Sequence, residues 1–173
     1  MAYTVLVALV GCERLAELVV TRRNAAWSFA RGGVEYGRRH YPWIVALHTG
    51  FLFACVVESW LAHRPFVPAL GVPMFVLVLA AQALRWWCVA SLGHQWNTRV
   101  IVVPGLSVVA RGPYRLLRHP NYVAVVVELV ALPLVHTAWV TAVVVTLLDV
   151  PLIAVRVRTE NRALATLTPE GAA

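Results

Sequence analysis

Lysine is absent from this sequence, and charge of either sign is scarce. Only 13% of the 173 residues are charged, 60% are hydrophobic, and the mean hydropathy is +0.72. Soluble domains carry about 25% charged residues. The composition therefore excludes an ordinary water-soluble domain and indicates a protein that lies in a lipid bilayer.

Cysteine pairs and nucleotide-binding glycine motifs are also missing. Cys12, Cys55 and Cys88 each fall in an apolar stretch, and none belongs to a CxxC pair. They are interpreted as small buried hydrophobic residues, with neither a disulfide nor a metal site. No GxGxxG follows a predicted strand, so the sequence does not indicate a Rossmann domain.

The basic residues that are present are all arginines, and they give a formal charge of +7 and a pI of about 10.2. Nucleic acid is the usual partner for such a balance. Here the arginines fall mostly in short loops between apolar stretches, where membrane orientation and anionic lipid headgroups account for them. We therefore expect membrane lipids, and no nucleic acid, as partners.

Apolar stretches about as long as a bilayer is thick recur along the chain. They predict an all-α integral membrane protein that forms a single domain over residues 1–173. The expected spans are residues 3–20, 43–61, 69–92, 121–135 and 139–155. The first span carries Glu13, Arg14 and Glu17 and lacks a basic start, so it is not expected to be a cleaved signal peptide.

The longest polar connection, residues 93–120, contains two β-branched runs around a Pro104–Gly105 turn. It predicts an irregular or hairpin-like loop. Such backbone is tolerated at membrane depth only where protein or a wet cavity covers it, which points to a site. After the last span, the spacing of residues 155–167 predicts a short amphipathic terminal helix.

The arginines also predict the orientation of the chain. Twelve of the fifteen fall in the first loop, the third loop and the tail: Arg22, Arg23, Arg31, Arg38, Arg39, Arg99, Arg111, Arg115, Arg118, Arg156, Arg158 and Arg162. The opposite loops hold only Arg64. The positive-inside rule then places the amino terminus outside and the carboxyl terminus in the cytoplasm of a multi-pass protein of the cytoplasmic membrane.

Several ionisable residues fall within or close to the spans, where each costs roughly 2.5–3.5 kcal/mol. They are Glu13, Arg14, Glu17, Glu58, Arg85, Glu128 and Asp149. Pairing between helices is the structural explanation, for example Glu17 or Glu58 with Arg14 or Arg85. Glu128 lies seven residues after Asn121, on the same helix face, so it either looks into a site or pairs with an arginine.

The densest polar cluster is the run from Arg111 to Tyr122. Pro120 suits the first turn of a helix, which places His119 near the cap and Tyr122 one turn inside. A helix start offers free N–H groups to an anion. The alternative is that the arginines only hold lipid headgroups. Further on, Arg156 and Glu160 have the spacing of a simple intrahelical ion pair.

The run GPYRLLRHPNY, a helical hairpin and then RVRTEN resemble the isoprenylcysteine carboxyl methyltransferase family of membrane enzymes. The segments ERLAELVVTRRN and RGGVEYGRRHYPWIVALH further resemble the bacterial branch associated with type III polyketide synthases. The resemblance implies an S-adenosyl-L-methionine-dependent O-methyltransferase whose cofactor is held by the loop and the terminal helices.

Matching positions then imply roles for individual residues. Arg156 would face the acceptor. The implied cofactor-binding residues are Leu106, Ser107, Val108, Val109, Tyr114, His119, Pro120, Asn121, Tyr122 and Glu160. Asn161 stands where many relatives carry a second acid, which puts the cofactor contacts of that helix in doubt.

The acceptor is expected to be a lipophilic small molecule. The polyketide-associated resemblance favours the hydroxyl of an alkylpyrone or alkylresorcinol, with an isoprenylcysteine-like carboxylate as the alternative. In the first case Arg156 stabilises the oxyanion and Glu128 takes or relays the proton. Competing hypotheses are an NADPH-dependent membrane reductase of the sterol-reductase type and a non-catalytic scaffold or transporter. The oligomeric state is left open.

Overall fold

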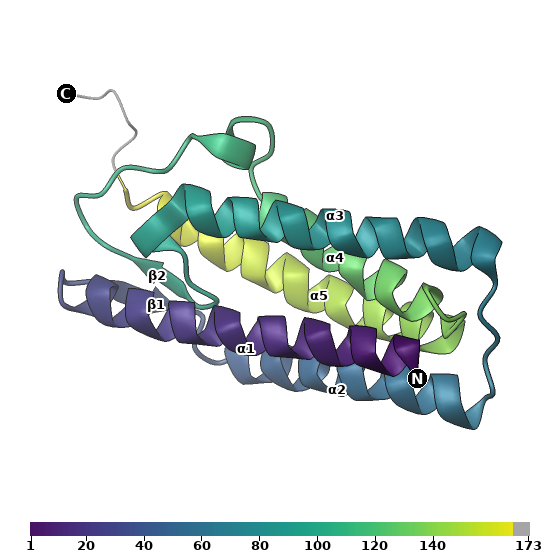
Figure 1. Cartoon of the computed structure of the whole chain (residues 1–173). Coiled ribbons are helices and arrows are strands. Elements are labelled where there is room, and N and C mark those ends of the chain that lie inside the picture. The colour runs from purple at the N-terminus through teal and green to yellow at the C-terminus, as the bar shows by residue number, and fades with distance from the viewer. Residues whose placement is uncertain (168–173) are drawn as a thin grey trace.

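The computed structural model describes residues 1–167 and contains five α-helices that run alongside one another in a bundle (Figure 1). The helices are α1 (Ala2–Phe29), α2 (Tyr41–Leu61), α3 (Pro68–Leu92), α4 (Pro120–Leu134) and α5 (Trp139–Leu164). Two short strands, β1 (Val34–Tyr36) and β2 (Val100–Val102), and two 3-10 turns, η1 (Gly93–Gln95) and η2 (Gly112–Arg115), complete the fold.

The helices agree with an all-α membrane protein. Three are long and apolar enough to cross a bilayer: Tyr41–Leu61, Pro68–Gln95 and Trp139–Leu164. The apolar helix α4 has only 15 residues, about 22 Å at 1.5 Å per residue, which is shorter than a hydrocarbon core of about 30 Å. Helix α1 carries Glu13, Arg14 and Glu17 near its middle and Arg22 and Arg23 closer to its end. The structure thus supports the membrane assignment, and the expectation of five full spans stays a prediction.

Large apolar side chains cover the outside of the bundle. Exposed examples are Trp43, Phe53, Trp60, Leu61, Trp87, Trp139 and Leu147. In water such a surface would drive aggregation, whereas in lipid it is the expected contact face. Cys12 also lies on an exposed face, against our expectation that all three cysteines are buried; Cys55 and Cys88 are buried.

The terminal helix expected over residues 155–167 does not exist as a separate element. Helix α5 continues without a break from Trp139 to Leu164. The sequence changes from apolar to polar near Arg156, but residues 152–164 contain neither glycine nor proline, so nothing ends the helix there. The prediction mistook a change of environment for a change of secondary structure.

The loop of residues 93–119 does not fold into a hairpin of its own. Its strand β2 pairs in antiparallel fashion with β1, with Val34 opposite Val102 and Tyr36 opposite Val100. Val100 and Val102 are buried in a cluster with Ala163 of α5. Pairing with β1 therefore lets β2 bury its valines on the end of α5, and this tertiary contact determines the partner strand.

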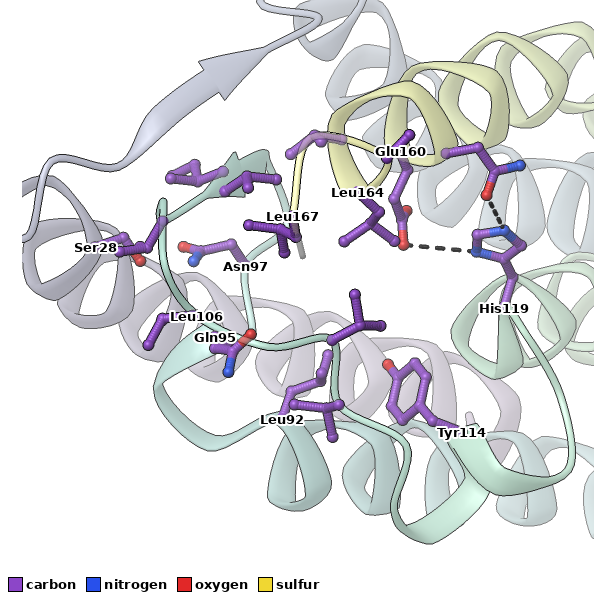
Figure 2. A pocket seen from close by; sticks show the side chains of 18 of the residues that line it. Ser28, Leu92, Gln95, Asn97, Leu106, Tyr114, His119, Glu160, Leu164 and Leu167 are labelled. Carbon is purple, nitrogen blue, oxygen red and sulfur yellow. Dashed lines mark hydrogen bonds and ion pairs between the residues drawn. The ribbon is translucent and has the colours of Figure 1, made fainter. Parts of the chain in front are cut away.

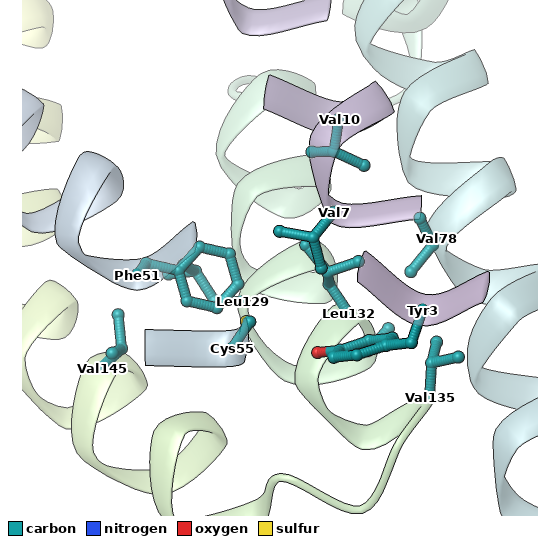
Figure 3. Close-up of a cluster of buried hydrophobic side chains, with 11 residues drawn as sticks. Tyr3, Val7, Val10, Phe51, Cys55, Val78, Leu129, Leu132, Val135 and Val145 are labelled. Atoms are coloured by element: carbon teal, nitrogen blue, oxygen red, sulfur yellow. The ribbon is translucent and has the colours of Figure 1, made fainter. Parts of the chain in front are cut away.

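The apolar core lies toward the end of the bundle that holds the amino terminus, away from the strands (Figures 1 and 3). All five helices contribute to it. Its buried members include Tyr3, Val7 and Val10 of α1, Phe51 and Cys55 of α2, Val78 of α3, Leu129 and Leu132 of α4, and Val145 of α5. This packing fixes the helices, so that the loops at the other end are free to shape a site.

A charged cluster joins α1, α3 and α4 inside the bundle. Glu128 accepts hydrogen bonds from Arg14 and Arg85, each at 2.9 Å. Arg14 also pairs with Glu17, which confirms the pairing expected between these two. Glu58 does not join the cluster: it pairs with Arg64 at 2.9 Å. Mutual pairing offsets the cost of placing these charges in lipid.

Candidate functional site

A cavity of about 570 Å³ lies at the end of the bundle where the loop of residues 93–119 crosses the end of α5 (Figure 2). Residues of β2 and the loop form one part of its wall, and Glu160, Asn161 and Leu164 of α5 form another. Ser28 reaches it from α1. This volume lies within the roughly 300–1,000 Å³ of typical small-molecule sites.

Helix α1 and helix α3 hold the loop in place. Asn24 donates hydrogen bonds to the backbone oxygens of Gly93 at 3.0 Å and of Trp96 at 2.8 Å. Further along, Arg111 donates to the backbone oxygen of Ser91 at 2.9 Å. These contacts tie both ends of the loop to packed helices, which fixes the cavity wall between them.

His119 and Glu160 face each other at the edge of the cavity. Pro120 begins α4 and leaves His119 at the N-cap position. From there the His119 Nδ1 lies 3.5 Å from Glu160 Oε1, and its Nε2 lies 3.0 Å from Asn161 Oδ1 (Figure 2). The Glu160 carboxylate raises the pKa of His119, against the opposing effect of burial. The pair places an imidazole and a carboxylate side by side at this part of the cavity.

Tyr122 and Arg156 continue this network away from the cavity edge. Tyr122 donates its hydroxyl hydrogen to Glu160 Oε2. The same hydroxyl oxygen accepts from Arg156 Nε at 2.9 Å, and Arg156 Nη2 donates to the backbone oxygen of Thr98. The loop, α4 and α5 are therefore linked through one guanidinium group, whose fork geometry serves several acceptors at once.

A second cavity, of about 560 Å³, lies between the helices and is lined mostly by apolar side chains of α1 and α2. Tyr122 and Asn121 of α4 line it, as does Arg156 of α5. Arg156 lines the first cavity as well. The two cavities therefore meet at the Arg156 side chain.

The structure brings together most residues that the sequence singled out. The first cavity is lined by Leu106, Val108, Val109, Tyr114, His119 and Glu160. Asn121 and Tyr122 line the second cavity instead. The linings of the two cavities include neither Ser107 nor Pro120. Burial raises the pKa of Tyr114 well above its usual range, so this phenol stays a hydrogen-bond donor at the cavity wall.

Glu128 reaches the site only indirectly. Its Oε2 accepts from Arg85, and Arg85 in turn donates to Asn121 Oδ1 at 3.3 Å. Gln82 joins the same cluster by accepting from Arg14 at 2.7 Å. Glu128 is therefore paired with arginines, which is one of the two roles expected for it from the sequence.

Sequence reasoning missed several lining residues, among them Ser28, Gln95, Asn97 and Arg99. Both amide atoms of Asn97 are buried and make no hydrogen bond to any residue within 1–167. The polar run GHQWNTR was a signal for this part of the site. Ser28 could not be predicted from the sequence, because it lines the cavity only as a result of the length and packing of α1.

A helical bundle with lipid-facing apolar sides and, at one end, a cavity of cofactor size with polar and apolar walls defines a membrane protein with a small-molecule site. The isoprenylcysteine carboxyl methyltransferase (ICMT) family matches residues 74–166, which include the loop of residues 93–119 and the hairpin of α4 and α5. The chain belongs to this family of membrane methyltransferases, whose members use S-adenosylmethionine. The resemblance to the isoprenylcysteine carboxyl methyltransferase family is thereby confirmed, and the association with polyketide synthases stays a prediction.

Two relatives cover nearly the whole chain. A protein of Bacillus subtilis (strain 168), described as "Uncharacterized protein YpbQ", is 36% identical over 163 residues, which are 94% of this chain and 96% of that protein. An "Uncharacterized protein" of Haemophilus influenzae (strain ATCC 51907 / DSM 11121 / KW20 / Rd) is 25% identical over 158 residues, 91% of each chain. No solved structure shows a significant match.

Proposed function

We propose that the protein transfers a methyl group from S-adenosyl-L-methionine to an oxygen of a lipophilic acceptor. In this proposal the cofactor lies in the first cavity and the acceptor in the second. The observation that carries it is the position of Arg156, which lines both cavities and bonds to Tyr122 at their junction. A cavity lined by both charged and apolar groups suits the cofactor, and the mostly apolar cavity beside it suits a lipid.

The first cavity has the groups that this cofactor requires. Glu160 offers a carboxylate to its amino or ribose hydroxyl groups. The amide of Asn97, which has no hydrogen-bond partner among residues 1–167, offers a donor and an acceptor to its base. Arg99 and Arg118 also line the cavity and supply positive charge for its carboxylate. When bound, the cofactor supplies an electrophilic methyl group on a sulfonium ion.

The residues of this chain then have to align the acceptor and exclude water. Arg156 is placed to orient an anionic oxygen and to stabilise it. Tyr122 holds the guanidinium at the junction. We assign Glu128 a positioning role, because its Oε2 is already engaged by Arg14 and Arg85 and it touches neither cavity directly.

For the acceptor we favour the hydroxyl of a long-chain polyketide, an alkylpyrone or alkylresorcinol, over an isoprenylcysteine-like carboxylate. The apolar second cavity suits the chain of either lipid. The choice between them rests on the amino-terminal segments that resemble the polyketide-associated branch. A carboxylate would need only Arg156 for orientation, whereas a phenol near pKa 10 needs help of roughly 4 kcal/mol at pH 7.

The test is ligand binding followed by turnover. Purified protein in detergent should bind S-adenosylhomocysteine and not NADPH, and it should transfer labelled methyl groups to an alkylresorcinol. Arg156→Lys should lower kcat by about tenfold or more, because lysine lacks the planar fork that serves Tyr122 and the acceptor together. Binding of NADPH alone would favour the reductase, and binding of neither would favour a scaffold.

A further inference from the structure

His48 of α2 and Asp149 of α5 face each other deep in the second cavity. Both residues line it, and His48 Nε2 lies 3.5 Å from Asp149 Oδ1. The Asp149 side chain is only 2% exposed. None of the residues 1–167 donates a hydrogen bond to either of its oxygens, and His48 Nε2 is likewise without a hydrogen-bond partner there.

The other charged side chains of this cavity each have at least one hydrogen-bond partner. Arg14 bonds to Glu17, and Arg85 bonds to Asn121. A buried carboxylate without hydrogen bonds carries a desolvation penalty of about 1–3 kcal/mol or more. Ionisable residues within membrane-spanning helices are rare, and they commonly mark functional sites. An acid and an imidazole on a cavity wall have the donor and acceptor groups that bind a hydroxyl.

The position of this pair relative to Arg156 defines the geometry of the ligand. Asp149 and Arg156 are seven residues apart on α5, so they lie on one face, about 10 Å apart along the helix axis. His48 stands in the same relation to Tyr41 on α2, and Tyr41 bonds to Thr98 beside Arg156. The pair therefore lies deeper in the bundle than the junction of the cavities.

We propose that His48 and Asp149 form a second polar subsite, which binds a hydroxyl group of the acceptor other than the oxygen that is methylated. This inference rests on the proposed function. One acceptor oxygen lies at Arg156, and the second donates its hydrogen to Asp149 and contacts the His48 ring. The preferred acceptors are then lipids whose ring carries two separated oxygens, and a lipid with a single hydroxyl binds less well.

The experiment compares pentadecylresorcinol with pentadecylphenol, two lipids that differ by one ring hydroxyl. For the wild type, kcat/KM should favour the resorcinol by about tenfold or more, the range expected for a hydrogen bond to a charged group. In Asp149→Asn this preference should fall to about twofold or less, through a higher KM for the resorcinol. The kcat/KM for the phenol should change much less than that for the resorcinol.

Two further variants make the result specific. His48→Gln should also lower the preference, and it provides a second reading if Asp149→Asn does not fold. Thr146→Val removes a buried hydroxyl one turn from Asp149 on the same helix, outside both cavity linings, and should keep the preference. Retained S-adenosylhomocysteine binding shows that each variant is folded.

Binding of the two lipids, followed by quenching of tryptophan fluorescence, tests the subsite without turnover. An equal affinity of the wild type for both lipids, or an unchanged preference in both His48→Gln and Asp149→Asn, would overturn this inference while methyl transfer persists. Failure of the proposed function looks different: neither lipid is methylated, although the resorcinol still binds more tightly in the wild type than in Asp149→Asn.

Discussion

At the scale of single residues, the site depends on a few polar side chains that hold one another in place. Glu160 receives the Tyr122 hydroxyl on one oxygen and faces His119 with the other. Arg156 completes the chain of contacts to the loop at Thr98. Removing one member leaves its neighbours unsatisfied, so the effects of substitutions here should not be additive.

His119 should make the stability of the site depend on pH. Its folded-state pKa is raised by Glu160, so the stabilising interaction is fully present below the unfolded value of about 6.5 and is lost as the pH rises through the raised pKa. The melting temperature of the wild type should therefore exceed that of His119→Gln most at about pH 6, and this difference should shrink toward about pH 8.5. Thermal unfolding in detergent measures it.

The control for this prediction is His63→Gln, at an exposed histidine in the link between α2 and α3. It controls for the loss of an imidazole that does not face Glu160. A difference for His119→Gln that does not vary with pH would contradict the raised pKa.

Glu128→Gln separates a positioning role from proton transfer. The change removes one carboxylate from the arginines of the charged cluster, so the free energy of unfolding should fall by about 3 kcal/mol. Methyl transfer should persist in the folded protein. A general base would show the opposite pattern, a loss of about 10²- to 10⁴-fold in kcat with little change in stability. Melting curves and labelled methyl transfer distinguish the two.

At the scale of elements, the loop of residues 93–119 depends on how closely it approaches α3. Gly112 has a φ of +59°, and a Cβ at this position would lie 2.1 Å from Ser91 Oγ and 3.1 Å from Trp87 Nε1. The loop therefore needs glycine both for its backbone conformation and for its packing. The glycine of the run RGPYR is therefore required for the structure of the loop.

Gly112→Ala should displace the loop and weaken S-adenosylhomocysteine binding by about tenfold or more, since the clash adds to a backbone cost of about 1–2 kcal/mol. Gly105→Ala is the matched control, because Gly105 has a φ of +82° but an added Cβ there would meet no heavy atom of the described residues within 4 Å. It carries the backbone cost without the clash and should bind nearly as the wild type does. Equal binding losses in the two variants would show that the approach to α3 does not shape the site.

The elements also show what the sequence can predict. Helices α2 and α3 follow from long apolar runs, and His119 at the start of α4 follows from Pro120. The pairing of β1 with β2 could not be predicted in this way, because β-branched runs favour a strand but do not determine which strand it pairs with. The length of α5 was misjudged for a related reason: a change from apolar to polar residues does not determine where a helix ends.

Within the site, the sequence predicted the residues that share a motif and missed those that tertiary packing brings in. Glu160, His119 and Tyr114 belong to the polar motifs and line the first cavity. Ser28 enters from α1, and the His48–Asp149 pair joins helices that are a hundred residues apart. Such contacts depend on helix packing, which periodicity alone does not specify.

At the scale of the whole molecule, the two ends of the bundle differ in chemistry. The strands, the loop and the end of α5 lie together at one end, and the amino terminus and the link between α2 and α3 lie at the other (Figure 1). Arg31, Arg38, Arg39 and Arg99 belong to segments of the first end, and Arg64 belongs to the second. Arg64 is moreover paired with Glu58, which leaves the second end nearly neutral.

This asymmetry predicts that the end with the first cavity faces the cytoplasm, where a soluble cofactor is available. Helix α1 is 28 residues long, about 42 Å, so it extends beyond a hydrocarbon core of about 30 Å on the side of Arg22 and Arg23. Alkaline phosphatase, which is active only outside the cytoplasm, should be active when fused after Arg64. It should be inactive when fused after Arg39 or after Leu167, and a fluorescent-protein fusion should show the reverse. Equal activity after Arg39 and Arg64 would mean that α2 does not cross the membrane, and it would overturn both the orientation and the access of the cofactor to the first cavity.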